Sequence, residues 1–327
     1  MKKCHFALAT AGLVSIVNAT ALAGDYPTAP VKIITQIGAG NGPDIALRVV
    51  ANQLGKLWKQ QAIVINQPGG GGLIAARNAA AAAPDGSTLF MAVASTFVAL
   101  PKLQKNLSFD VNQFEPIGFI GEVPMVLATS PSLPVSSVAE LTSLSRKHPR
   151  SLSIATTPRG DITHLSLELF RERSGADLTV VHYQTMAQAM NDVIPGRVAA
   201  AWEGIGGPSA KGQLKLLAVA SPSRMPSRPD LPTVAETVPG FVATGWWVLV
   251  APHGTPPEIV NKFSSDLRTV LVEPEVQQKF EQLGTLTRLM TPQQLANFIA
   301  SERRLWTPVI DKLGLQSTGA SMDSHAH

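Results

Sequence analysis

Residues 38–44 hold three glycines at alternate positions, followed by a proline and an aspartate. Gly38, Gly40 and Gly42 let the backbone adopt positive φ angles and let a ligand approach the main chain closely. Pro43 and Asp44 occupy positions where a first helical turn favours a proline and a carboxylate. An apolar strand, residues 31–37, precedes the turn, and an amphipathic helix follows it. The segment therefore predicts an anion site made of main-chain amides at a helix N-terminus.

A second glycine turn, residues 69–72, follows the next apolar strand, residues 62–66. An alanine-rich helix over residues 73–82 leads to a third strand, residues 88–94, after which Ser95 and Thr96 follow. The carboxyl ends of neighbouring parallel strands meet at one edge of a sheet, and that edge binds ligands. We therefore expect both glycine turns, Ser95 and Thr96 to face one crevice.

Polar residues also follow the strands of a second α/β series. Thr157, Arg159 and Thr163 lie between a strand over residues 152–155 and a helix over residues 163–174. Arg159 can bind a carboxylate bidentately or lie exposed in the loop. Thr163 can contact a ligand or simply cap the helix. The next two strands, residues 179–183 and 198–202, end at the polar segments Tyr183-Gln184-Thr185 and Trp202-Glu203-Gly204.

The sequence lacks the motifs for nucleotide binding, metal binding and covalent hydrolysis. The first glycine turn does not match G-x-G-x-x-G, and Asn66 stands where a dinucleotide-binding strand would supply a carboxylate. His164 and Glu168 do not form an H-E-x-x-H metal motif, and a core or surface histidine is the simpler interpretation of His164. Ser209 lacks the G-x-S-x-G pattern of a hydrolase nucleophile. We expect no cofactor, no metal and no enzymatic activity.

The first 23 residues have the features of a signal peptide. A basic start, Lys2 and Lys3, precedes an apolar run over residues 6–17 and the small-residue sequence Ala21-Leu22-Ala23. We expect cleavage after Ala23, a periplasmic location and no stable membrane insertion, because the apolar run is too short to span a bilayer. Cys4, the single cysteine, leaves with this peptide, so the mature chain has no thiol chemistry.

The charge of the chain is small. The formal net charge of +4 falls by two with the loss of Lys2 and Lys3, and aromatic residues make up only 6% of the chain. The sequence shows no basic cluster, so nucleic acid is not an expected partner. We expect the mature protein to be a monomer.

The order of elements predicts two α/β lobes. Three strand–turn–helix units in the first 95 residues predict a parallel sheet. Residues 115–129 look like a crossing segment of two apolar runs broken by Gly121 and Pro124. After a strand over residues 245–251, the chain is nearly all helical and needs a sheet to cover. We therefore place residues 24–124 and 247–327 in one lobe and residues 125–246 in the other, joined by a two-strand hinge beside a ligand cleft.

The chain resembles the exported solute-binding proteins of tripartite tricarboxylate transporters, the Bug family, from about Tyr26 to Gly314. No single motif is specific, but many occur in the family order. They are Tyr26-Pro27, the turn ending at Asp44, Asn66-Gln67-Pro68-Gly69, Pro84-Asp85-Gly86, Pro131-Ser132-Leu133-Pro134, His164, Tyr183, Leu231-Pro232-Thr233-Val234-Ala235-Glu236, Pro239-Gly240-Phe241, Trp246 and Ala251-Pro252.

The resemblance implies a class II periplasmic-binding-protein fold, in which the two lobes close on a small carboxylate that the first two glycine turns grip. It also implies delivery of the solute to membrane permease subunits. Carried over to this chain, the implied ligand contacts are Gly38, Ala39, Gly40, Asp44, Gly70, Gly71, Ser95, Thr96, Thr157, Thr163, His164 and Tyr183.

Departures from the family pattern leave the far end of the pocket open. The usual Ala-Ala-Gly-Gly-x-x-Asp turn contains Asn41 and Pro43 here, and Pro43 removes an amide donor. In the other lobe Arg159 and Asp161 replace small polar residues, and Gln184 stands where the family has lysine. We add Asn41, Arg159, Asp161, Gln184 and Glu203 to the candidate contacts.

Two alternatives to a carboxylate transport receptor stay open at this point. The first is a binding protein for an amino acid or a cationic ring compound, with Asp44, Asp161 or Glu203 facing the positive group. The second is a periplasmic sensor component, which would use the same closure of the lobes. The identity of the solute does not follow from the sequence.

Overall fold

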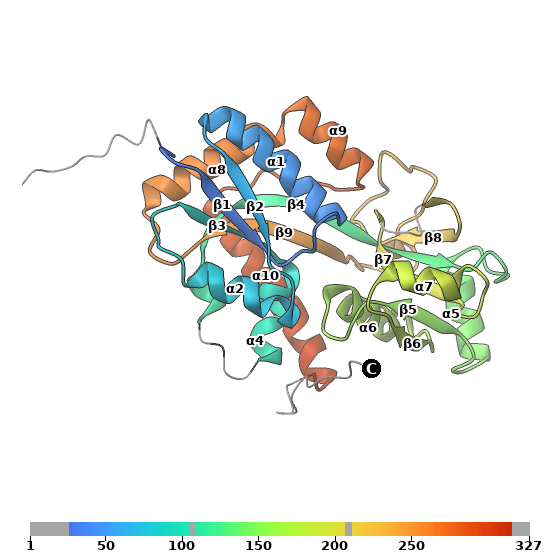
Figure 1. Ribbon diagram of the computed structural model, residues 1–327. Coiled ribbons are helices and arrows are strands. Elements are labelled where there is room, and N and C mark those ends of the chain that lie inside the picture. Colours follow the sequence, from blue (N-terminus) through green and yellow to red (C-terminus); the bar gives the residue numbers. More distant parts are fainter. Residues whose placement is uncertain (1–25, 105–106, 108, 207–210, 316–327) are drawn as a thin grey trace, which may run out of the picture.

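The computed structural model describes residues 26–104, 107, 109–206 and 211–315 (Figure 1). The predicted signal peptide lies outside these residues, and so do residues 317–327, for which the sequence predicts a loose polar tail. Within the described ranges, no helix combines the length and the apolar character that a membrane crossing requires.

The first three strands form the predicted parallel sheet. They are β1 (Val31–Thr35), β2 (Ala62–Asn66) and β3 (Thr88–Val93), with β1 in the middle. Helix α1 (Gly42–Trp58) and helix α2 (Leu73–Ala80) connect them, as expected. Helical spacing in the sequence predicts a buried face of Ala46, Val50, Leu54 and Leu57, and for Leu57 this prediction was wrong. Leu57 is 45% exposed because Trp58, four residues after Leu54, occupies that face.

The third strand leads directly into helical turns. Ser95 and Thr96 lie in the short helix α3 (Ala94–Val98), where the sequence predicted the end of a strand. Helix α4 (Leu100–Leu103) follows, and a 3₁₀ turn (Val111–Gln113) precedes the next strand.

Strand β4 (Glu115–Thr129) is one continuous strand of 15 residues, where the sequence predicted two separate apolar runs. Its residues 115–124 pair with β9 (Thr244–Ala251). Its residues 125–129 pair with β7 (Ala200–Gly204) and β8 (Lys215–Val219). The pairing with β9 shifts register twice, next to Gly118 and Gly121. These irregularities let one strand bend and serve two regions of the sheet.

The middle of the chain forms a second α/β unit. In chain order its elements are α5 (Val138–Lys147), β5 (Ser153–Thr156), α6 (Ile162–Ser174), β6 (Thr179–His182), α7 (Met186–Val193), β7 (Ala200–Gly204) and β8 (Lys215–Val219). Strands β6, β5 and β7 are parallel, and β4 runs antiparallel to β7 and β8.

After β9 the described chain is helical, as predicted. Helices α8 (Pro257–Leu271), α9 (Pro274–Gln282) and α10 (Pro292–Lys312) each begin at a proline, a residue suited to a first helical turn. Helices α8 and α10 pack against β4, so they cover the first sheet as expected. Helix α10 also contacts α6 of the second unit.

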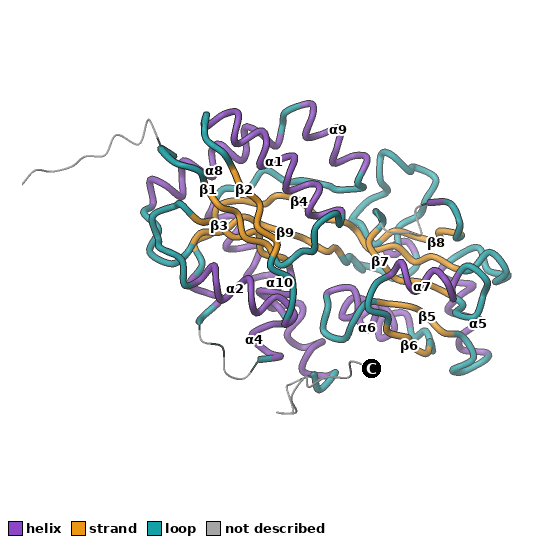
Figure 2. Tube along the Cα trace, viewed as in Figure 1, coloured by secondary structure: helices purple, strands orange, loops and turns teal. Residues whose placement is uncertain are grey.

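The strands join into one curled sheet in the order β2-β1-β3-β9-β4-β7-β5-β6, with β8 also paired to β4. Two lobes are visible in Figure 1 and Figure 2. We call the unit around β1, β2, β3 and β9 lobe 1, and the unit around β5 to β8 lobe 2. Besides β4, the segment between β8 and β9 connects the lobes, because it leads from lobe 2 back to lobe 1. It runs beside β4, where the Met125 amide donates to the Ala243 carbonyl at 2.9 Å. The residue boundaries given above stay a prediction.

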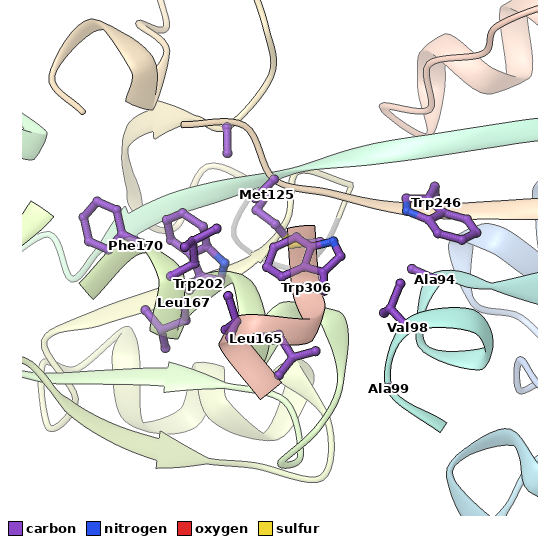
Figure 3. Close-up of a cluster of buried hydrophobic side chains, with 14 of the residues drawn as sticks. Ala94, Val98, Ala99, Met125, Leu165, Leu167, Phe170, Trp202, Trp246 and Trp306 are labelled. Atoms are coloured by element: carbon purple, nitrogen blue, oxygen red, sulfur yellow. The ribbon is translucent and has the colours of Figure 1, made fainter. Parts of the chain in front are cut away.

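A hydrophobic core runs through both lobes. Trp306 of α10 lies between residues of lobe 2, such as Leu165 and Trp202, and residues of lobe 1, such as Trp246 (Figure 3). The Glu302 carboxylate accepts hydrogen bonds from the indole N–H groups of Trp246 and Trp306, at 2.8 and 3.0 Å. The C-terminal helix thus holds the two lobes together through apolar contacts.

Candidate functional site

The first glycine loop is held in place by Asp44. This residue lies in the first turn of α1 and is only 1% exposed. Its carboxylate accepts a hydrogen bond from the Gly40 amide at 2.8 Å and one from Asn66 Nδ2 at 2.7 Å. Arg48, one helical turn later, donates to the same carboxylate at 3.1 Å. Asp44 is therefore engaged within lobe 1, and so is the amide of Gly40, which the sequence suggested as a ligand contact.

These partners set the charge state of Asp44. Burial on its own would raise the pKa of this carboxyl group, but the hydrogen bonds from Asn66, Gly40 and Arg48 outweigh burial and lower the pKa below its usual value. The Asn66 carboxamide completes the network, since its Oδ1 accepts from Arg48 at 2.7 Å and its Nδ2 also donates to the Ile37 carbonyl at 2.9 Å. Asn66 thus ties the end of β2 to the first loop, a role the sequence analysis missed.

Two amides of the first loop have no partner in the described chain. The amides of Gly38 and Ala39 donate no hydrogen bond to any described residue, whereas the Ile37 amide donates to Thr35 and the Asn41 amide to the Gly38 carbonyl. The Asn41 side chain also donates to that carbonyl at 3.0 Å, so it stabilises the turn. Gly38 and Ala39 therefore present two free N–H donors at the end of β1.

The second glycine loop offers two more donors. Gly69, Gly70, Gly71 and Gly72 all have positive φ angles, of 118°, 58°, 62° and 95°. This run of left-handed backbone favours glycine at all four positions. The Gly72 amide donates to the Gly69 carbonyl at 3.0 Å, while the amides of Gly70 and Gly71 donate to no group of the described chain.

A glutamine that the sequence analysis did not select connects the two loops. Gln36 follows β1, and its side chain lies against the backbone of Gly72. Thr96, which is fully buried in α3, donates its hydroxyl to Gln36 Oε1 at 2.7 Å. Only the polar character of Gln36 at the end of an apolar strand signalled it in the sequence.

In lobe 2, His164 lies in the protein interior. It is 2% exposed, and its Nδ1 accepts a hydrogen bond from the Gly160 amide at 3.1 Å. Its Nε2 lies 3.7 Å from Glu168 Oε1. Burial, and then the nearby His182, Arg159 and Arg171, lower the pKa of His164 to about 4. His164 is therefore neutral at pH 7, and its Nδ1 holds the loop of residues 157–161 at the Gly160 amide.

Tyr183 is also engaged within lobe 2. Its hydroxyl donates to Asp192 Oδ2 at 2.7 Å, and its amide donates to the Thr156 carbonyl at 3.0 Å. Burial, reinforced by Asp192, raises the pKa of Tyr183 to about 12. The phenol thus braces helix α7 against the end of β6.

The other predicted residues of lobe 2 differ in exposure. Arg159 and Gln184 are exposed, and Thr157 and Thr163 are partly buried. Glu203 is 3% exposed and lies on β7 opposite Val126. Asp161 immediately precedes α6, and burial raises its pKa, although the Thr157 hydroxyl beside it opposes the shift.

The loop of residues 157–161 also touches lobe 1. At Gly160 a Cβ atom would come within 2.8 Å of Leu103 in α4, so this glycine permits a close approach of the two lobes. On another side, Lys312 of α10 pairs with Glu172 of α6 at 2.7 Å. A cavity of about 330 Å³ lies beside this ion pair, and no predicted site residue lines it.

Comparison with known proteins gives one consistent result. The family model described as the tripartite tricarboxylate transporter family receptor matches residues 46–315. The chain is 32% identical to protein BugT of Bordetella pertussis over 315 aligned residues. The alignment covers 94% of this chain and 95% of BugT.

Two solved structures also match this chain over most of its length. Rpa4515 of R. palustris, solved with adipate, matches with a TM-score of 0.79 and 30% identity over 89% of this chain and 99% of that one. MatC of Rhodopseudomonas palustris, solved with bound malate, matches with a TM-score of 0.74 and 27% identity over 87% of this chain and 100% of that one.

Proposed function

Because the chain belongs to the tripartite tricarboxylate transporter receptor family, we propose that it captures a small organic carboxylate between its lobes and delivers it to a membrane transporter. The observation that carries this proposal is the set of free amides on the two glycine loops. Gly38, Ala39, Gly70 and Gly71 present N–H donors with no partner in the described chain. A carboxylate has lone pairs for several such donors, and main-chain amides at loop and helix starts favour anions.

Two further observations support a carboxylate. The hydrogen bonds of Asp44, Asn66 and Gln36 hold both loops in place before any ligand arrives, which lowers the ordering cost of binding. In addition, two structural relatives were solved with adipate and malate, and both molecules are organic carboxylates.

The residues proposed for the site remain those named from the sequence, but only some of them are now proposed to touch the ligand. Free amides grip the carboxylate in lobe 1. Asp44, His164 and Tyr183 support the loops from within, since their polar atoms have protein partners. The exposed Arg159 and Gln184 face whatever the solute carries at its other end. We also propose export to the periplasm with cleavage after Ala23.

A calorimetric screen of the mature protein tests this function. The panel contains mono-, di- and tricarboxylates, each with its neutral amide as a matched control. We expect at least one carboxylate to bind and raise the melting temperature, while its amide does neither. Absence of binding across the whole panel would refute a carboxylate receptor. Recovery of the unchanged ligand after incubation would fit a receptor, whereas its conversion would indicate an enzyme.

A binding protein for a solute that also carries a positive group is the second candidate. Asp161 favours it, because this carboxylate is partly buried next to the lobe 1 contact at Gly160 and forms no ion pair among the described residues. Substituting Asp161 by Asn should then raise the Kd of an ammonium-bearing ligand by a factor of about ten, which corresponds to about 1.4 kcal/mol of binding free energy. An unchanged affinity would remove Asp161 from the site.

A further inference from the structure

Gln36 occupies the space between the two glycine loops. Its side chain lies over the backbone of Gly72, where a Cβ atom would come within 2.4 Å of Gln36 Nε2 and 2.5 Å of Oε1. Gly72 therefore leaves room for the carboxamide of a residue on the other loop. The amide of Gln67, which begins the second loop, donates to the Thr35 carbonyl at 2.8 Å, so main-chain pairing also joins the two loops.

Thr96 fixes the orientation of this carboxamide. The Thr96 hydroxyl donates to Gln36 Oε1 at 2.7 Å and is held in a fully buried side chain of α3. The acceptor end of Gln36 is thereby occupied. Its Nε2 donates no hydrogen bond in the described chain and is not among the buried unpartnered atoms. The Nε2 of Gln36 therefore has donor capacity that no described group of the protein uses.

The charged side chains beside the first loop are already paired, so a bound carboxylate depends on neutral donors such as Gln36 Nε2. In this part of the described chain, Asp44 and Arg48 are paired with each other, and Arg48 is further occupied by Asn66. A carboxylate at the glycine loops thus meets neutral donors. A side-chain amide supplies additional hydrogen bonds to the anion without the desolvation cost of a buried cation.

We propose that Gln36 binds the solute directly, donating from Nε2 to the carboxylate held by the glycine loops, with Thr96 as its positioning residue. This inference rests on the proposed carboxylate-binding function. The Gln36 donor belongs to a side chain, so a substitution can remove it. The main-chain amides of the two loops cannot be removed in this way.

Calorimetric titration of the mature protein with malate, adipate and acetate tests the assignment. Gln36→Glu places a negative charge against the carboxylate and should raise the Kd at least tenfold. Gln36→Met keeps the size of the side chain but removes the donor, and should raise the Kd at least threefold. Thr96→Val should give a smaller increase, because the donor stays but is no longer oriented.

Gln67→Glu is the matched control. It makes the same charge change on the neighbouring loop, but the Gln67 side chain accepts from Asn78 Nδ2 at 2.9 Å and is directed to α2. We expect its Kd within twofold of the wild type. Melting temperatures without ligand show whether each variant is folded.

The outcomes separate the two proposals. If the wild type binds a probe and both Gln36 variants bind it within twofold, Gln36 only connects the loops and the assignment is wrong. If the wild type binds none of the three probes nor any carboxylate of the wider panel, the proposed function fails, and the assignment fails with it. If Gln67→Glu raises the Kd as much as Gln36→Glu does, the effect is one of long-range charge, and the assignment is also wrong.

Discussion

Asp44 combines deep burial with a full set of partners. It is 1% exposed, and its two carboxylate oxygens accept from Gly40, Asn66 and Arg48. Removing the charge weakens three hydrogen bonds at once, because charged acceptors bind donors more strongly than neutral ones. The position of the first glycine loop depends on this single side chain.

We expect Asp44→Asn to lower the free energy of unfolding at pH 7 by about 1–3 kcal/mol. The folded-state pKa of Asp44 lies below its unfolded value of about 3.9. The stabilisation is therefore complete above the unfolded pKa and is lost as the pH falls through the folded pKa. Urea denaturation at pH 7 and pH 3 measures the difference, which should shrink at pH 3. Asp230→Asn, at an exposed aspartate, should change stability by less than about 0.5 kcal/mol.

His164 makes stability depend on pH in a different window. Its pKa of about 4 in the folded chain compares with about 6.5 in an unfolded one. Between these values the unfolded chain binds a proton that the folded chain does not, so the free energy of unfolding falls as the pH drops from 6.5 to 4.

Substituting His164 by Asn should make this fall less steep, because the titrating group is gone while an acceptor for the Gly160 amide remains. Denaturant titrations at half-unit pH steps, with an NMR titration of the His164 ring, provide the measurement. A variant with the wild-type slope would show that His164 does not carry the effect.

The sequence located the two glycine loops but not the side chains that hold them. Glycine and proline alone indicated a turn followed by a helix start at residues 38–44 and a second turn at residues 69–72. Positive φ occurs at all four glycines of the second turn, but in the first turn only at Gly40 and not at Gly38 or Gly42. The partnership of Gln36 with Thr96 joins positions 60 apart, and no local pattern records it. For the same reason the internal roles of Asn66, His164 and Tyr183 became visible only in the structure. The contact of any of these residues with a solute stays a prediction.

At the scale of elements, the second glycine loop is constrained by backbone and by space. Gly71 and Gly72 have φ angles of 62° and 95°, which L-residues adopt at a cost of about 1–2 kcal/mol. A Cβ at Gly71 would meet nothing within 4 Å, whereas one at Gly72 would meet the Gln36 side chain.

We therefore expect Gly71→Ala and Gly72→Ala to differ in stability. Both substitutions should lower the free energy of unfolding because alanine is strained at a positive φ angle. Gly72→Ala also displaces Gln36 and breaks its hydrogen bond to Thr96, which lowers the free energy of unfolding by about 1 kcal/mol more. Chemical denaturation of both variants gives the comparison. Equal losses would mean that Gln36 moves aside without losing its partner.

Two helices with capping signals have the bounds expected from the sequence. Helices are expected over residues 138–147 and 292–312, and α5 and α10 span these residues. Both begin after a residue, Ser137 or Thr291, whose side chain accepts from the first turn. Strand β7 was expected at residues 198–202 but lies at 200–204, because the Val198 amide closes a turn with the Asp192 carbonyl. An apolar run does not show where a preceding turn ends.

At the scale of the whole molecule, Trp306 joins the lobes. It is 1% exposed and belongs to a core cluster that contains Leu165 and Trp202 of lobe 2 and Trp246 of lobe 1. The lobe 2 contacts of α10 were not foreseen, since helical periodicity identifies a buried face but not which elements cover it.

Trp306→Ala should lower the free energy of unfolding by about 3–5 kcal/mol, because it leaves a cavity between the lobes. Leu305→Ala is the control in the same helix, since Leu305 is 36% exposed and should cost far less. Denaturation followed by circular dichroism measures both. A loss in Trp306→Ala no larger than that of the control would show that α10 does not hold the lobes together.

The position of β9 between β3 and β4 sets an order in which the protein can be completed during synthesis. Lobe 2 is built from one continuous stretch that ends with β8, whereas β3 pairs Phe90 with Val250, far later in the chain. At about 5–20 residues per second, the ribosome needs roughly 6–24 seconds for the 122 residues (251 − 129) between the end of β4 and the end of β9. Lobe 1, although its first strands emerge earliest, is finished last. A chain released before α10 would therefore carry lobe 2 but lack the completed lobe on which the proposed solute loops depend.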